Sequence, residues 1–136
     1  MPGELDLATL LSSMTPMLRN GEFVFCTVPP AQVMQLQLDP ICQFLEDEGV
    51  TLIVSREDAD RCGLPYDYVA RMVTLSVHSS LSAVGFLAAI ATHLANAGIS
   101  VNPVSAYYHD HLFIPSDRAE DTMAILNRLS SPVSDV

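Results

Sequence analysis

The stretch from Val69 to Ile114 limits what this 136-residue chain can fold into more than any other part of it. A β-branched and aromatic run leads into a serine-rich turn, a helical pattern covers residues 83–97, and Gly98 follows as a helix-ending residue. Two further strands flank His109-Asp110, a pair typical of a tight turn. This order of strand, helix, strand and strand predicts helices packed on a mostly antiparallel sheet.

The C-terminal half is one strand short of a complete βαββαβ unit. Asp117 and Glu120 resemble a capping box that opens a last helix. The half therefore reads β-α-β-β-α, so we expect the missing strand to come from the first half or from a partner chain.

The first twenty-eight residues predict a helix followed by a hairpin. Asp6 is placed to cap a short helix with apolar residues at helical spacing. Asn20-Gly21 favours a type I′ turn, so strands are expected at residues 17–19 and 22–28, paired with each other.

The rest of the first half predicts a second alternation of helix and strand. Asp39-Pro40 indicates the start of a helix, and Gly49 is placed to end it. A short strand over residues 50–54 and a capping box made by Ser55 and Asp58 come next. Each half thus runs strand, helix, strand and helix, a structural pseudo-repeat.

The charge balance argues against nucleic acids and anionic membranes as partners. The chain has six arginines, no lysine and sixteen Asp and Glu, for a net charge of −10. Such a chain repels phosphate groups. Tyr107 and Tyr108 have no cation near them in the sequence, so we expect them to fill core and interface positions and not to stack on bases.

The sequence favours a cytoplasmic protein. Its acidic N-terminus lacks a basic region followed by a long apolar stretch, so no signal peptide is expected. The most apolar stretch, residues 81–97, is too short and too polar for a transmembrane helix. The cysteines at positions 26, 42 and 62 form no CxxC pair, which favours buried, reduced thiols.

Motifs for catalysis and cofactor binding are missing from the sequence. We find no nucleophile elbow, P-loop, dinucleotide-binding glycine pattern or HExxH motif, and we predict that the protein is not an enzyme and takes no cofactor. His109-Asp110-His111 offers metal-ligand side chains, but they are consecutive and lie in a tight turn. We therefore expect hydrogen-bonded polar side chains there and no metal, with a metal protein or enzyme as the alternative.

The motif LSVHSSLSAVGFLAAIATHLANAGISVNPVSAYYHDHLFIP resembles an ACT domain, and the chain is similar to stand-alone bacterial tandem ACT-like proteins. ACT units also occur in aspartate kinases and in cytosolic arginine sensors. The resemblance implies an α+β fold of two ferredoxin-like ACT units of βαββαβ type, a divergent one over residues 1–67 and a second over residues 68–136. It also implies a ligand held between the strand-to-helix turn of one unit and the facing edge of another. The matching positions are His78, Ser79, Ser80, Leu81, Ala83, Val84, Gly85, Asn102, Pro103 and Val104.

Elementary chemistry agrees with such a site but also allows simpler roles. A helix N-terminus offers free N–H groups and a partial positive charge to a carboxylate, and Asn102 offers both a donor and an acceptor. The alternatives are that the serines at 79, 80 and 82 only cap the helix, and that Gly85 only permits close packing. Asn102-Pro103 is alternatively a bulge on an edge strand.

The resemblance implies a regulatory protein that binds a small molecule, in the first place an amino acid, and responds through homodimer formation or partner binding. The few cations favour a neutral or basic ligand over an acidic one. The alternative is an interaction module that oligomerises without a ligand. The identity of the ligand, the regulated partner and the competence of each half are not determined by the sequence.

Overall fold

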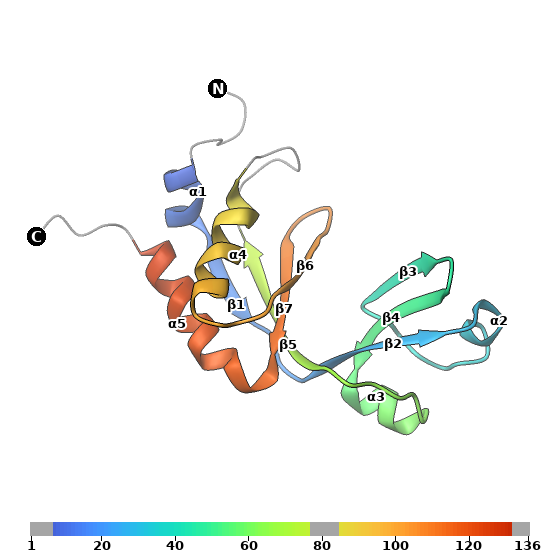
Figure 1. The fold of residues 1–136 in the computed structure, drawn as a ribbon. Helices are drawn as coiled ribbons and strands as arrows, with labels where there is room; N and C mark the ends of the chain where they lie inside the picture. Colours follow the sequence, from blue (N-terminus) through green and yellow to red (C-terminus); the bar gives the residue numbers. More distant parts are fainter. Residues whose placement is uncertain (1–6, 77–84, 132–136) are drawn as a thin grey trace, which may run out of the picture. The chain divides into compact units, whose positions relative to one another are not determined.

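The computed structural model describes residues 7–76 and 85–131, which form a mixed α and β fold (Figure 1). Contacts divide the chain into two compact units. The central unit comprises residues 20–71, and the terminal unit comprises residues 1–19 together with residues 72–136. β5 (Val69–Ser76) begins in the central unit and continues into the terminal unit.

The central unit is a complete βαββαβ arrangement. Its sheet has the strand order β3-β4-β2-β5, in which β2 pairs with both β4 and β5 in antiparallel orientation. The core lies on one face of this sheet and is built from alternate residues, such as Val24 and Val54, which are 0% exposed. The elements before β5 are β2 (Phe23–Val28), α2 (Pro30–Val33), β3 (Cys42–Glu46), β4 (Gly49–Ser55) and α3 (Arg56–Arg61).

The helix predicted after Asp39-Pro40 is wrong. Residues 42–46 form β3, which pairs antiparallel with β4 from Cys42 opposite Ile53 to Glu46 opposite Gly49. The helix of this region is the four-residue α2, which comes earlier in the chain. Cross-strand pairing with the apolar strand β4 outweighs the local helix signals, because propensity is a weak preference that tertiary pairing overrides.

The hairpin predicted at Asn20-Gly21 is also wrong, although both of its strands exist. β1 (Thr15–Leu18) pairs with β5 and not with β2. Gly21 has a φ of 86°, so the pair does turn the chain, but it connects the terminal unit to the central unit. A turn signal reports local backbone geometry and does not say which strands become neighbours.

Of the capping box predicted before α3, the Ser55 N-cap bond is confirmed. The Ser55 side chain accepts a hydrogen bond of 3.1 Å from the backbone N–H of Asp58. This bond satisfies one of the unpaired donors at the start of the helix.

The terminal unit gains its fourth strand from the N-terminus of the chain. Its strand order is β1-β5-β7-β6, with β1 antiparallel to β5 from Thr15 opposite Ser76 to Leu18 opposite Val73. The strand that the sequence left unassigned is therefore β1, from the first half. The remaining elements are α1 (Leu7–Ser13), α4 (Phe86–Asn96), β6 (Asn102–Ser105), β7 (Asp110–Pro115), the 3-10 helix η1 (Ser116–Arg118) and α5 (Ala119–Ser130).

The capping box predicted from Asp117 and Glu120 is wrong. α5 begins at Ala119 after η1, and its N-cap residue Arg118 makes no side-chain capping bond. The Arg118 guanidinium instead donates to the carbonyl of Ala97 at 3.1 Å and pairs with Asp121 at 3.0 Å. Arg118 thus ties the start of α5 to the end of α4, where the exposed carbonyl groups favour a cation.

Candidate functional site

The N-terminus of α4 forms the described part of the predicted turn site. Gly85 is the N-cap residue, with a φ of 90°, and its carbonyl accepts a 2.9 Å hydrogen bond from the N–H of Ala89. A positive φ is the conformation that glycine adopts without a steric penalty, so the backbone geometry accounts for Gly85 at this position. Glycine also contributes no side-chain acceptor to the first turn of the helix.

The rest of the predicted turn lies outside the described residues. This applies to His78, Ser79, Ser80, Leu81, Ala83 and Val84. Whether the serines cap α4 or leave its amides to a ligand therefore stays a prediction.

The second predicted element of the site, Asn102 to Val104, lies on β6. β6 is the edge strand of the terminal unit's sheet and pairs with β7, Asn102 opposite Phe113 and Val104 opposite His111. Asn102 and Pro103 are exposed and Val104 is half-buried. The one-to-one register confirms the edge strand and contradicts the bulge, because a bulge places two residues opposite one. Pro103 is tolerated because an edge strand leaves one row of backbone groups unpaired.

Gly85 and Asn102 lie on either side of α4 in the chain. Gly85 precedes α4, while Asn102 follows its end through residues 97–101. An 11-residue helix is about 16 Å long. Gly85 thus lies at the N-terminal end of α4, and Asn102 begins the next strand after the helix.

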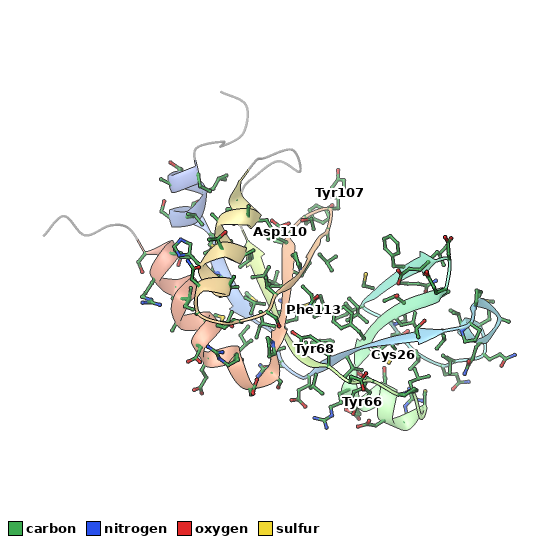
Figure 2. All side chains as sticks on the ribbon, viewed as in Figure 1. Cys26, Tyr66, Tyr68, Tyr107, Asp110 and Phe113 are labelled. Atoms are coloured by element: carbon green, nitrogen blue, oxygen red, sulfur yellow. The ribbon has the colours of Figure 1, made fainter. Side chains whose placement is uncertain are left out.

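The β6–β7 hairpin presents two exposed tyrosines at its tip. The turn is closed by a 2.9 Å hydrogen bond from the N–H of Ala106 to the carbonyl of His109. Tyr107 and Tyr108 are each 80% exposed, with edge-to-face rings 4.9 Å apart, and Tyr107 points away from the hairpin (Figure 2). The expectation that they fill core positions is wrong; the expectation that they form an interface stays a prediction.

His111 makes a hydrogen bond with a buried threonine. Its Nδ1 atom lies 3.1 Å from the hydroxyl of Thr74, which is 6% exposed. The His109 ring centroid lies 6.2 Å from that of His111. Within the described part of the chain no three His, Cys, Asp or Glu side chains form a group suited to a metal ion.

Burial lowers the pKa of His111, and the nearby His109 and Arg19 lower it further, while Asp110 opposes them. We expect this histidine to make stability depend on pH. In the folded protein the imidazole stays neutral at pH values just below its ordinary pKa of 6.5. The unfolded chain binds a proton at this histidine in the same pH range. Stability should therefore fall as the pH drops from about 6.5 through the lower folded-state pKa.

The measurement is the urea-unfolding free energy between about pH 7.5 and pH 5.5. His111→Gln should flatten this pH dependence, whereas Thr92→Ala, at an exposed position on α4, should leave it unchanged. Equal slopes for the wild type and His111→Gln would contradict the assignment.

The cysteines do not form a reactive centre in the described residues. Cys26 is buried in β2, and burial raises the pKa of its thiol, which disfavours the reactive thiolate. Cys42 and Cys62 are free and half-buried. The structure is therefore consistent with the expected reduced state, but of the three cysteines only Cys26 is fully buried. Cys42 lies in a strand and not in the helix predicted for it.

One polar network was not foreseen from the sequence. Arg56 donates to the Tyr66 hydroxyl and to Glu22, each at 3.0 Å, and the Tyr66 hydroxyl donates to Asp60 at 2.7 Å. These groups are exposed and join α3 to the segments on either side of it in the central unit. Their separation in the sequence is too large for a spacing rule, and the network braces the unit without forming a site.

Comparison with known protein families decides the classification. One ACT domain model matches residues 2–71 and a second ACT domain model matches residues 68–128. The chain belongs to the ACT domain family. The two ferredoxin-like units predicted from the resemblance are thereby confirmed as two ACT domains in tandem.

Solved structures show the same tandem ACT fold. A Vibrio cholerae protein of unknown function is 43% identical, with a TM-score of 0.85 over 92% of this chain and 96% of that one. An Agrobacterium tumefaciens protein is 15% identical, with a TM-score of 0.64 over 89% and 92% of the two chains. The regulatory subunit of Thermus thermophilus aspartate kinase, in its ligand-free form, is 14% identical, with a TM-score of 0.60 over 86% and 98%. A comparison with curated proteins found no match.

Proposed function

We propose that this tandem ACT protein is a cytoplasmic regulatory sensor that binds a small molecule, in the first place an amino acid. Ligand binding then shifts its homodimer formation or its affinity for a partner. The single observation that carries the proposal is membership of both halves in a family of ligand-binding regulatory domains. We propose that the two domains comprise residues 1–67 and 68–136 of the sequence. β1 lies in the first of these ranges but pairs with β5 of the C-terminal domain.

The α4 N-terminus supports a carboxylate-binding role. Helix dipoles place a partial positive charge at this end, and the first N–H groups of a helix have no partner within it. The N-cap residue Gly85 brings no side chain that could occupy them. We propose that the predicted positions 78–81 and 83–85 hold the carboxylate of the ligand.

The exposed edge strand β6 supports the second half of the site. Asn102 offers an amide to the amino group or side chain of the ligand, and Pro103 and Val104 offer apolar contact. Since Gly85 precedes α4 and Asn102 follows it, we propose that the turn of one copy and the β6 edge of a second copy contribute to one ligand site. Binding would then stabilise the association of the parts that contribute to it.

We expect at least one of the twenty amino acids to raise the melting temperature of the protein. At a ligand concentration of 100 Kd the folded state gains about 2.7 kcal/mol. Asn102→Ala should reduce this shift and leave the ligand-free melting temperature unchanged, because its side chain is exposed. Ser105→Ala, also exposed on β6, is the matched control. Absence of a shift with every amino acid at millimolar concentration would contradict the proposal.

The second candidate function is an interaction module without a ligand. The exposed apolar side chains on the molecular surface favour it, Tyr107 and Tyr108 among them. It predicts an oligomer whose stability is unaffected by amino acids.

No helix in residues 7–76 and 85–131 has the length and hydrophobicity to cross a bilayer.

A further inference from the structure

Asn20-Gly21 is an exposed turn at the point where the chain leaves the terminal unit and enters the central unit. Gly21 has a φ of 86°. Within the part of the chain that the structure describes, neither the Asn20 side chain nor the Gly21 N–H has a hydrogen-bond partner. The side-chain carboxamide and the following peptide nitrogen are neighbours in the chain, so they are free to react with each other.

Glycine after asparagine leaves this peptide nitrogen unhindered. Attack of the nitrogen on the Asn20 side-chain carbonyl closes a five-membered ring, and a side chain on the following residue would crowd the approach. Gly21 has no Cβ atom. A Cβ atom built there would have no atom of the described residues within 4 Å, apart from its neighbours in the chain. The surroundings of the turn therefore leave room for the reaction and for water.

We propose that Asn20 is a site of spontaneous deamidation, a modification whose only co-reactant is water. The Gly21 N–H gives its proton to water, and the nitrogen attacks the Asn20 Cγ atom. A C–N bond forms and the bond from Cγ to the carboxamide nitrogen breaks, so that this nitrogen takes up a proton and leaves as ammonia. Water then opens the cyclic imide at one of its two carbonyl carbons. Opening at Cγ leaves aspartate, and opening at the main-chain carbonyl leaves isoaspartate.

The other three asparagines of the chain serve as internal controls. Asn102 precedes Pro103, whose nitrogen has no hydrogen to give up. Asn96 precedes Ala97, whose N–H donates to a carbonyl of α4 at 3.0 Å. Asn127 lies inside α5, where the next N–H belongs to the hydrogen-bond pattern of the helix. We therefore expect these three positions to react much more slowly than Asn20.

Isoaspartate would lengthen the main chain between two anchored residues. It adds one carbon–carbon bond, about 1.5 Å, to the path of the backbone. Before the turn, the Arg19 N–H donates to the Met72 carbonyl at 2.8 Å. After the turn, the Glu22 carbonyl accepts from the Arg56 N–H at 2.9 Å. Since only two residues separate these anchors, we expect the added length to weaken at least one of the two hydrogen bonds.

Peptide mapping by mass spectrometry tests the site. The full chain is kept at physiological temperature and mildly alkaline pH, and samples are digested at intervals. The peptide that contains Asn20 should gain about 1 Da as its carboxamide becomes a carboxylate. This conversion should be at least about tenfold faster than at the other asparagines. Asn20→Gln is the matched variant, because glutamine keeps the exposed amide but needs a larger ring, and position 20 should then stay unmodified.

A synthetic peptide of residues 17–24 supplies the reference rate for an unfolded Asn-Gly pair. We expect the folded chain to convert within about tenfold of this rate. A peptide that converts while the full chain does not would overturn the proposal, because the folded turn would then protect Asn20. Conversion at Asn127 as fast as at Asn20 would also contradict it, since the open turn would then give no advantage.

Amide hydrogen exchange tests the effect on the anchors. Ion exchange separates the modified chain, which carries one additional negative charge. The fraction that contains isoaspartate should show faster exchange at Arg19 or Arg56. Freshly prepared Asn20→Asp, which has the charge without the added length, should not. Unchanged exchange at both amides would refute the weakening of the anchors. Deamidation needs no ligand, so these results are independent of the thermal-shift test of the sensor.

Discussion

Leu10→Ala destabilises the terminal unit by about 2–5 kcal/mol. Leu10 lies in α1 and is 0% exposed. It packs in one core cluster with residues from α4, α5 and β7, among them Ile90, Leu126 and Leu112. The substitution leaves a cavity that these close-packed neighbours fill only in part, so the lost burial and the cavity both count.

The comparison with Leu7→Ala tests whether the N-terminal segment packs in the core of the terminal unit. Leu7 belongs to the same helix but is 36% exposed, so its truncation should cost no more than about 0.5 kcal/mol. Urea unfolding gives the free energies, and amide hydrogen exchange locates the loss. For Leu10→Ala we expect faster exchange in β7 and unchanged exchange in β4. Equal, small effects of both variants would show that the N-terminal segment is not part of the terminal unit's core.

Gly49→Ala destabilises the central unit by about 2–5 kcal/mol, the sum of a steric clash and an unfavourable backbone conformation. Gly49 begins β4, next to β2 in the sheet. A Cβ atom there would lie 2.9 Å from the Thr27 hydroxyl oxygen and 3.2 Å from the Val28 carbonyl oxygen. The hydroxyl can rotate away, but the carbonyl belongs to the sheet and must shift.

Two further variants separate the clash from the backbone cost. Gly63 has a φ of +68°, and a Cβ atom added there would have no other atom within 4 Å, so Gly63→Ala should cost only about 1–2 kcal/mol. Thr27→Ala removes one of the two close contacts, so Gly49→Ala should be less harmful in that background. Urea unfolding of the four proteins measures both effects. If Gly49→Ala costs no more than Gly63→Ala, the close approach has no energetic consequence.

The sequence predicts only part of the candidate site, for a physical reason. The α4 helix follows from its 3.6-residue periodicity and from Gly98, and the structure contains it over residues 86–96. Whether its first amides meet Asn102 depends on contacts between elements, which a periodic pattern does not encode. Gly85 and Asn102 both belong to the terminal unit, on either side of α4, so the proposed site, which sets a turn against a facing edge, takes them from two copies of the chain.

The sequence by itself determined those features that depend on near neighbours along the chain. The Ser55 cap, a turn between the last two strands, the apolar strands and the ACT motif are all short-range patterns. The turn itself lies at Tyr107-Tyr108, two residues before the predicted His109-Asp110, because Asp110 is already part of β7. The fold class followed from their order.

Only the tertiary structure decided which strands became neighbours. Residues 42–46 follow a helix-start signal and precede a glycine, yet they form a strand that pairs with β4. Cross-strand hydrogen bonds and side-chain pairs stabilise this strand by more than the small differences in local propensity. β1 pairs with β5 and not with its predicted hairpin partner, since this pairing places Leu10 and Met14 in the terminal unit's core. Burial of apolar surface between distant segments stabilises a fold by more than any single turn, and it leaves no mark at the turn itself.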